Sequence, residues 1–176
     1  GELGSASQKE ALLPAIAAGE TLVSLALQEA PHHAPLHCAM PASKAGDHFI
    51  LSGTKLLVMD APAADAFIVF ARTSGAPGDD DGLSAFLLPA DTEGLTVEPG
   101  KMVDSRAYGT LNLTDVKVPA DQLLGEIDQA SKGLGHALDI INIGLASELL
   151  GLSAEAFERT AEYLKERKQF GRVIGS

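Results

Sequence analysis

The stretch Tyr163-Leu-Lys-Glu-Arg-Lys-Gln-Phe-Gly171 ends the longest run of helical periodicity in the chain. From about Ser131 to Lys168, apolar residues recur at spacings of mostly three to four, which is the pattern of an amphipathic helix. They are Leu134, Leu138, Ile141, Leu145, Leu149, Leu152, Ala156 and Leu164. A helix of about 35 residues is about 50 Å long at ~1.5 Å per residue, too long to be buried in a globule of 176 residues. We therefore predict that it belongs to a helical bundle whose other members are not in this chain.

The end of this helix is rich in basic residues. Lys165, Arg167 and Lys168 complement the negative pole of the helix dipole. Gly171 can adopt the left-handed conformation that often follows a helix, and we predict that it stops the helix.

Composition excludes several classes of protein. A formal net charge of −11 argues against a surface that follows nucleic-acid phosphates. No run of about 18 apolar residues occurs, so we expect no membrane span, and the first residues do not resemble a signal peptide. The single cysteine, Cys38, excludes an internal disulfide and is typical of a reducing compartment. We therefore expect an acidic, soluble, intracellular protein.

Between residues 22 and 125 the sequence predicts an all-β module. The segment Phe49–Met59 has the pattern of a hairpin with its turn at Ser52-Gly53. Residues 30–47 and 73–82 are rich in turn-forming residues and are expected to be loops. Other predicted strands are Leu22–Gln28, Ala66–Ala71, Leu83–Leu88, Leu95–Glu98, Thr110–Thr114 and Val116–Val118. Short strands separated by turn residues indicate an antiparallel sandwich or barrel.

The predicted fold class is therefore mainly β: an antiparallel β-sandwich or barrel between a short N-terminal helix and a long C-terminal helix. The short helix is expected over residues 5–17, where serines can cap its start and Pro14 limits it.

Neither a metal site nor a catalytic set emerges from the residues alone. His32, His33, His37 and Cys38 share one loop, but adjacent histidines point in different directions and no second cluster completes a ligand set, so an exposed loop is expected. The run Asp79-Asp-Asp81 lacks the spacing of a calcium-binding loop. Cys38 has no His-Asp partner recognisable from spacing, and no Gly-x-Ser-x-Gly turn occurs.

Four stretches of the chain carry a family signature. They are Leu13-Pro-Ala-Ile-Ala-Ala-Gly-Glu20, Gly53-Thr-Lys55, Asp115-Val-Lys-Val-Pro-Ala-Asp-Gln-Leu-Leu-Gly125 and Glu166-Arg-Lys-Gln-Phe-Gly-Arg-Val-Ile174. In this order they resemble the Leu-Pro-x-x-x-x-Gly-Glu, Gly-x-Lys, Asp-Val-x-Val-Pro and Glu-Arg-x-Gln-Phe-Gly-x-x-Ile motifs of the acyl-CoA dehydrogenase family. The resemblance covers nearly the whole chain.

The resemblance implies a domain organisation. Such enzymes have an N-terminal helical domain, a middle β domain of two packed sheets, and a C-terminal four-helix domain through which they form tetramers. By resemblance, residues 1–21 end the first domain, residues 22–125 form the second, and residues 126–176 begin the third.

The resemblance also implies an activity. The family oxidises the α,β carbon–carbon bond of an acyl-CoA thioester, as in fatty-acid β-oxidation: a carboxylate removes the α proton while N5 of FAD accepts the β hydride. We expect a homo- or hetero-tetramer in the bacterial cytoplasm or mitochondrial matrix, with electron-transfer flavoprotein as electron acceptor. In most members the base is a glutamate that would lie beyond Ser176, so no catalytic residue is expected in this chain and residues 1–176 alone should be inactive.

Four residues acquire expected roles by resemblance. Arg167, Gln169 and Phe170 would contact the FAD of a neighbouring subunit, with the arginine facing the pyrophosphate. The alternative is that Arg167 and Lys168 only cap the helix. Asp139 matches a family aspartate near the substrate, although the family's arginine three residues on is Asn142 here.

The flavin-facing motifs depart from the family pattern. The family's Thr-Glu-x-x-x-Gly-Ser-Asp corresponds to Gln28-Glu-Ala-Pro-His-His-Ala-Pro35, which keeps Glu29 but replaces the threonine by Gln28 and the serine by Ala34. The family's Trp-Ile-Thr corresponds to Leu57-Val58-Met59. Backbone donors could still hold a flavin, because they do not depend on side-chain type.

Three hypotheses remain open. The chain is part of a divergent FAD-binding acyl-CoA dehydrogenase, or it is a structural subunit without its own flavin that offers Arg167 and Phe170 to an active partner in a mixed tetramer. The third, a β-sandwich binding module with no flavin role, is disfavoured by the ordered motifs.

Overall fold

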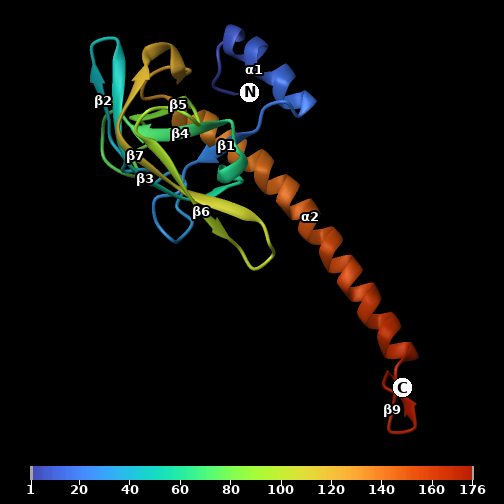
Figure 1. The fold of residues 1–176 in the computed structure, drawn as a ribbon. Helices are drawn as coiled ribbons and strands as arrows, with labels where there is room; N and C mark the ends of the chain where they lie inside the picture. The colour runs from blue at the N-terminus through green and yellow to red at the C-terminus, as the bar shows by residue number, and fades with distance from the viewer. Residues whose placement is uncertain (1, 176) are drawn as a thin grey trace. The chain divides into compact units, whose positions relative to one another are not determined.

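The computed structural model describes residues 2–175. It divides into two compact units, one reaching to Leu134 and the other starting at Gly135. The first unit contains the helix α1 (Ala6–Ala18) and two four-stranded sheets. The second contains most of the helix α2 (Ala130–Glu166) and a small hairpin (Figure 1). The predicted boundaries at residues 21 and 125 stay a prediction.

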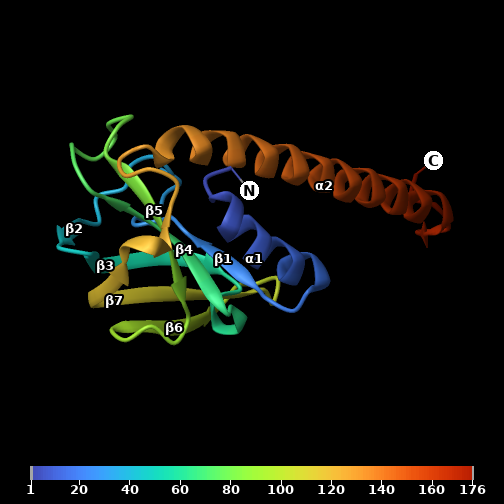
Figure 2. The same ribbon diagram turned by 90° about the horizontal axis from the view of Figure 1, so that it is seen from above.

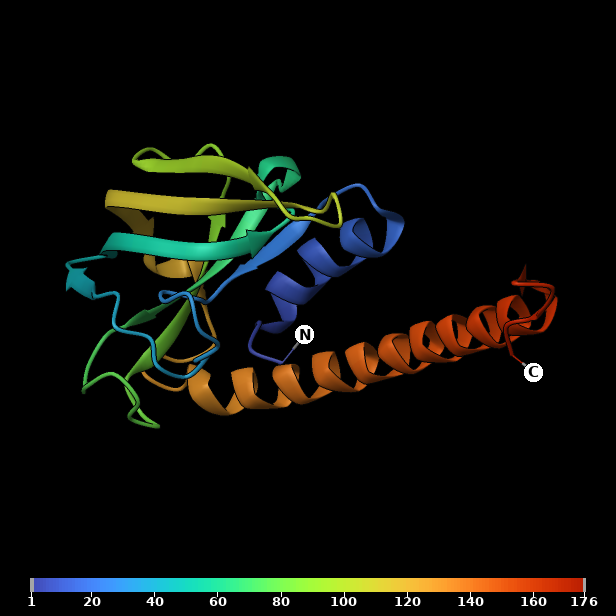
Figure 3. The same ribbon diagram turned by 90° about the horizontal axis from the view of Figure 1, so that it is seen from below.

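The first unit is built from two sheets with strand orders β1-β4-β5-β8 and β2-β3-β7-β6 (Figure 3). The strands are β1 (Val23–Ala26), β2 (Ala42–Ala45), β3 (His48–Met59), β4 (Ala66–Arg72), β5 (Leu83–Pro89), β6 (Leu95–Lys101), β7 (Ala107–Pro119) and β8 (Leu123–Leu124), with 3-10 turns η1 (Ala61–Ala63) and η2 (Ala120–Gln122). Neighbouring strands in these sheets are antiparallel except for β1 and β4. The predicted mainly β fold, with a short N-terminal helix and a long C-terminal one, is confirmed.

The core lies between the inner faces of the two sheets. Phe49 of β3 and Phe86 of β5 meet there with ring centroids 5.0 Å apart at an interplanar angle of 59°. Strand β3 alternates between buried and partly exposed residues near its start, as expected when only one face of a sheet is covered. Strands β4 and β5 are buried over almost their whole length, which explains their continuous apolar sequences.

The predicted hairpin within Phe49–Met59 is wrong, because β3 runs through it as one strand. Gly53 (φ 152°) lies at a shift in the pairing with β7, not in a turn. A Cβ on Gly53 would lie 2.5 Å from Cγ of Met40, so a close approach by a distant segment explains the glycine.

Two residues with positive φ mark β-bulges in this pair of strands. Asp115 (φ 48°) is the extra residue of β7 between the pairs Leu51–Val116 and Gly53–Leu113. The predicted break between Thr110–Thr114 and Val116–Val118 is therefore wrong, since the bulge bends one continuous strand. Leu57 (φ 52°) is the extra residue of β3 in the second bulge.

Helix α1 begins with a capping box in which Ser5 and Gln8 satisfy each other's backbone N–H groups. The prediction that Pro14 limits this helix is wrong, because the helix continues to Ala18 and ends at the left-handed Gly19. The side chain of Gln8 also donates hydrogen bonds to the carbonyls of Asp121 and Leu123, both at 3.0 Å, which tie α1 to the η2–β8 segment. Figure 2 shows the course of α1 and of the strands of the first unit.

Helix α2 has 37 residues, close to the predicted span. Its exposed large apolar side chains are Ile140, Ile141, Ile143, Leu145, Leu149, Leu150, Leu152, Phe157, Tyr163 and Leu164. One window of α2, with a mean hydropathy of 1.4, is long and apolar enough to cross a membrane by length and composition alone. This is weak evidence, since helices of soluble bundles pass the same test, and the absence of a membrane span stays a prediction.

The chain turns back on itself after α2. Strands β9 (Lys168–Gln169) and β10 (Arg172–Val173) form a two-stranded antiparallel hairpin. Its two-residue turn, Phe170-Gly171, has φ values of 49° and 80°, the positive values typical of a type I′ turn. The prediction that Gly171 stops the helix is wrong, because α2 ends at Glu166 and Gly171 serves the hairpin turn.

Candidate functional site

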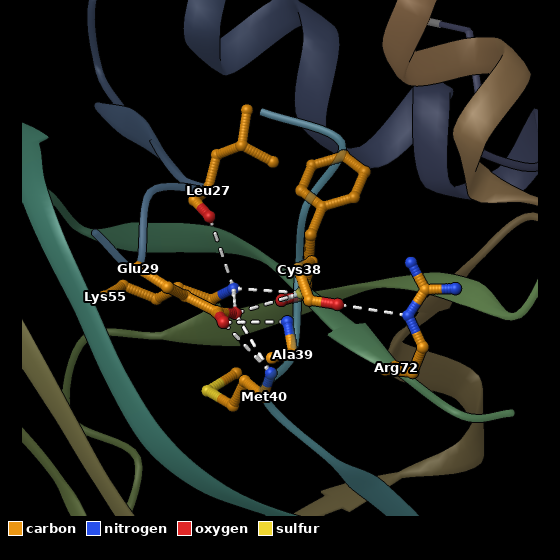
Figure 4. A network of polar contacts seen from close by, with 8 residues as sticks. Leu27, Glu29, Cys38, Ala39, Met40, Lys55 and Arg72 are labelled. Carbon is orange, nitrogen blue, oxygen red and sulfur yellow. Dashed lines mark hydrogen bonds and ion pairs between the residues drawn. The ribbon is translucent and has the colours of Figure 1, made fainter. Parts of the chain in front are cut away.

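A buried charged cluster lies where the connection from β1 to β2 meets strand β3 (Figure 4). The side chain of Lys55, on β3, is fully buried, and its Nζ lies 2.6 Å from Oε1 of Glu29. The same Nζ also donates to Sγ of Cys38 at 3.3 Å and to the carbonyl of Leu27 at 3.4 Å. A buried ammonium needs such partners, because an unpaired charge in a core is strongly destabilising.

Glu29 joins the two ends of the β1–β2 connection. Its carboxylate accepts hydrogen bonds from the backbone N–H groups of Ala39 at 2.8 Å and Met40 at 3.1 Å, besides the one from Lys55. Charge-assisted hydrogen bonds of this kind are about twice as strong as neutral ones. The connection between Glu29 and Ala39 is therefore closed at its base by the protein's own groups.

The electrostatics of this cluster are those of a structural ion pair. Burial alone would raise the pKa of Glu29, but the charge of Lys55 and the hydrogen bonds from Lys55, Cys38 and Ala39 outweigh it and hold that pKa below its ordinary value. Burial, with the nearby Glu29 carboxylate, raises the pKa of Cys38 to about 11 despite the opposing charge of Lys55. Cys38 is thus a neutral thiol near pH 7 and is unsuited to nucleophilic chemistry.

Arg72, at the end of β4, extends the cluster to a neighbouring loop. Its Nε donates to the carbonyl of Cys38 at 3.1 Å, and its Nη1 donates to the carbonyl of Asp81 at 2.8 Å. Its backbone N–H donates to the carbonyl of Met40 at 2.7 Å. Arg72 therefore links the end of the β1–β2 connection to the acidic loop around Asp81.

Gln28, immediately before Glu29, braces the start of the connection. Its side-chain Nε2 donates to the carbonyl of Ala30 at 2.9 Å and to that of His32. A glutamine amide has two N–H groups, so both are committed to the loop itself. The carbonyl of Gln28 accepts a hydrogen bond of 2.7 Å from the N–H of Leu56 on β3, which fixes the loop to the strand.

The β3 bulge next to this contact presents an aliphatic side chain. Leu57 is 42 % exposed, whereas Val58 is buried. A leucine with positive φ is a genuine backbone outlier, and such strain concentrates at functional or tightly constrained positions. Position 57, where the resemblance leads one to expect an aromatic ring, therefore offers only hydrocarbon.

The three residues predicted to contact a cofactor, Arg167, Gln169 and Phe170, come together at the β9–β10 hairpin. With its amide oxygen facing the guanidinium, Gln169 accepts hydrogen bonds from Nε and Nη2 of Arg167 at 3.2 and 2.7 Å. The Phe170 side chain is fully exposed at the turn. The N–H of Gly175 donates to the carbonyl of Leu164 at 2.9 Å and anchors the hairpin to the end of α2.

Asp139 lies near the other end of α2 and is exposed. Twenty-eight residues separate it from Arg167, about 40 Å along a helix at ~1.5 Å per residue. Within one chain, the predicted substrate residue and the hairpin residues therefore cannot contact the same atoms of a ligand.

The sequence analysis did not identify Lys55, Cys38 and Arg72 as one cluster. The sequence contained an indication that Lys55 is buried. It lies an even number of residues from the buried Phe49 and Leu51, so all three side chains point to the same face of β3. The loop histidines His32, His33 and His37 are exposed while Cys38 is buried. Over residues 2–175 no group of three or more His, Cys, Asp or Glu side chains is arranged to hold a metal ion.

Comparison with known proteins gives a consistent result. A family model described as "Acyl-CoA dehydrogenase, middle domain" matches residues 33–116. The short/branched chain specific acyl-CoA dehydrogenase of Bos taurus mitochondria is 35% identical over 178 residues, covering 99% of this chain and 41% of that protein. The Caffeyl-CoA reductase-Etf complex subunit CarC of Acetobacterium woodii is 30% identical over 175 residues, covering 97% of this chain and 46% of that protein.

A solved structure agrees with these relatives. The glutaryl-CoA dehydrogenase of Mycobacterium smegmatis in complex with FADH2 superposes with a TM-score of 0.86 at 29% identity, covering 98% of this chain and 44% of that one. The chain thus spans less than half the length of the proteins that it matches.

Proposed function

Because the chain belongs to the acyl-CoA dehydrogenase family, we propose that it works in an FAD-dependent enzyme that oxidises the α,β carbon–carbon bond of an acyl-CoA thioester. The observation that carries this proposal is Phe170, a fully exposed aromatic side chain at a turn with positive φ. Three cationic residues lie next to it in the hairpin: Arg167, Lys168 and Arg172. The expected electron acceptor is electron-transfer flavoprotein, in line with a relative that is a subunit of an Etf complex. The expected location is the bacterial cytoplasm or the mitochondrial matrix.

The hairpin has the chemistry of a dinucleotide contact. Arg167, Lys168 and Arg172 supply positive charge for a diphosphate, and Phe170 supplies an apolar ring that can pack on an aromatic group. A bulky residue with positive φ costs about 1–3 kcal/mol, a cost that persists where the strained geometry serves a role. We infer that the hairpin contacts the FAD of a neighbouring subunit in a homo- or hetero-tetramer.

The β domain of this chain does not fit a flavin of its own. At the positions that face the flavin by resemblance, Gln28 has committed its amide protons to Ala30 and His32, and Ala34 and Leu57 have no polar side-chain atoms. The polar edge of an isoalloxazine ring therefore lacks side-chain donors at these positions. FAD bound elsewhere in the assembly would supply the two-electron chemistry, and the contributions inferred for this chain are the hairpin and, near the acyl-CoA, Asp139.

This observation favours a second candidate within the same assembly. The chain acts as a structural subunit without its own flavin and pairs with a flavin-carrying partner to which it offers Arg167 and Phe170. The two candidates differ in stoichiometry: one flavin per chain if every subunit binds FAD, and about half as much per chain in a mixed tetramer.

The test uses the whole protein that contains this chain, purified alone and together with its partner subunit. Flavin absorbance per chain and acyl-CoA-dependent reduction of an electron acceptor are measured for the wild type, Arg167→Gln and Phe170→Ala. The hairpin variants should lose flavin by about tenfold or more, since two charge-assisted hydrogen bonds or a packed ring correspond to over 1.4 kcal/mol. Arg159→Gln is the matched control, because Arg159 pairs with Glu155 on the exposed surface of α2. Full flavin content in both hairpin variants, or no flavin in any assembly, would contradict the proposal.

A further inference from the structure

We propose that Gln28 is a specificity-determining residue that closes the β1–β2 connection on itself and thereby keeps a flavin out of this chain's own β domain. The inference rests on the proposed function, because it concerns which subunit of an acyl-CoA dehydrogenase assembly carries the FAD. It goes further by assigning the exclusion to one side chain.

The first step is that the base of the connection is closed without a ligand. Glu29, at its start, accepts the N–H groups of Ala39 and Met40 at its end, and the fully buried Lys55 neutralises the carboxylate. Among residues 2–175, no buried side-chain nitrogen or oxygen lacks a hydrogen-bond partner. Glu29 and Lys55 match the family motifs, so this closure is the frame on which the difference at Gln28 acts.

The second step is the brace itself. The Gln28 amide donates to the carbonyls of Ala30 and His32, both within the connection. A threonine has one hydroxyl donor on a shorter side chain and cannot donate to both carbonyls at once. A threonine at this position would have one hydroxyl donor available to a ligand. Gln28 instead uses both of its N–H donors to order the loop.

The third step joins the loop to the bulge of β3. The N–H of Leu56 donates to the carbonyl of Gln28 at 2.7 Å, so this backbone donor is committed as well. The next residue, Leu57, is the strained bulge residue and turns an exposed aliphatic side chain outward. At the junction of loop and strand, the Gln28 amide and the Leu56 N–H are therefore both used inside the protein.

These contacts make a chemical prediction about ligands. An isoalloxazine ring presents carbonyl oxygens and ring nitrogens that must be hydrogen-bonded when they leave water. Because the donors at Gln28 and Leu56 are already engaged, they cannot pair with those acceptors, and a ring bound here would lose two hydrogen bonds. Flavin binding here requires the brace to open and a free donor to replace it.

The experiment compares two variants of the whole protein in complex with its partner. The variant Ala34→Ser/Leu57→Trp restores a hydroxyl and an aromatic ring but keeps the brace. The variant Gln28→Thr/Ala34→Ser/Leu57→Trp differs from it only at position 28. Flavin released on denaturation is measured per chain, and hydrogen–deuterium exchange is followed for the amides of His37, Ala39 and Leu56, whose hydrogen bonds close the connection or fix it to β3. Gln122→Thr, on η2 away from the connection, is the control for a glutamine-to-threonine change.

We expect the variant that keeps Gln28 to match the wild type in flavin content. The variant that lacks Gln28 should exchange the amides of His37, Ala39 and Leu56 several-fold faster and bind several-fold more flavin. The assignment to Gln28 is overturned if both variants bind equal flavin, or if flavin rises without faster exchange. One flavin per wild-type chain overturns the exclusion but upholds the proposed function. No flavin and no acyl-CoA oxidation in any assembly overturns the proposed function itself. Thermal unfolding of each variant identifies any that has simply failed to fold.

Discussion

Replacing Lys55 by methionine, which removes one buried charge, should strongly destabilise the first unit. The Lys55 side chain is fully buried, and its Nζ is 2.6 Å from Oε1 of Glu29. Methionine fills a similar volume, so the variant removes the charge without opening a large cavity. Glu29 is then left partly buried without its counter-charge, which is the costly way to break a buried ion pair.

The size of the expected loss of stability depends on the hydrogen bonds that Glu29 retains in the Lys55→Met variant. Removing one partner of a fully buried pair costs about 3–5 kcal/mol. The Glu29 side chain is 18% exposed and still accepts the N–H groups of Ala39 and Met40, so the cost here should lie just below that range, at about 2–3 kcal/mol. For a chain of this size, that corresponds to a fall in Tm of about 5–10 °C.

The assay is thermal and denaturant unfolding of the whole protein, with a double-mutant cycle. Lys55→Met/Glu29→Gln should recover part of the loss, because the unpaired charge disappears with the second change. Lys117→Met is the matched control, because Lys117 is exposed on β7, and should lie within about 0.5 kcal/mol of the wild type. A Lys55→Met protein as stable as the control would refute the reasoning, as would a double variant that is the sum of the two single ones.

Two further predictions concern the same cluster. The depressed pKa of Glu29 means that its contribution to stability is present above its unfolded pKa of about 4.3 and is lost as pH falls through the lower folded pKa. Glu29→Gln should therefore be less stable than the wild type at neutral pH and lose less stability in acid, as measured by Tm from pH 7 to 3; parallel curves would contradict this. Because its pKa is raised to about 11 and it is buried, Cys38 should resist alkylation by iodoacetamide at pH 8 until the protein unfolds, whereas native-state labelling at the rate of a free thiol would disprove it.

Local sequence patterns were sufficient for the layers of the fold but not for the course of individual strands. The alternating and continuous apolar runs around Phe49, Ala66 and Leu83 identified strands, because burial on one or both faces of a sheet leaves a period in the sequence. Gly53 was wrongly predicted to lie in a turn. The position requires glycine because a Cβ there would collide with Met40, which is distant in sequence. A contact of that kind has no local signature.

The candidate site divides in the same way. The hairpin residues Arg167, Gln169 and Phe170 form a continuous motif, so they could be named from the sequence, although their roles stay predictions. The Glu29–Lys55–Cys38 cluster could not be found, because it forms only when the β1–β2 connection returns across β3. Once β3 is known to be one strand, the alternation of side chains along it places Lys55 on the inner face, but only its partners explain how a charge can lie there.

The two units differ in how far they satisfy their own side chains, and this difference bears on where the activity resides. In the first unit, the loop that would face a flavin is ordered by Gln28, Glu29 and Lys55. In the second, α2 and the hairpin leave large apolar side chains such as Ile143, Leu150 and Phe170 exposed. Each is worth about 1.5–3 kcal/mol when fully buried, so contacts with further helices of the whole protein or with a partner subunit would be stabilising. We therefore propose that this chain orders the loop of its own β domain without a ligand and presents Phe170 of its hairpin to a partner's site.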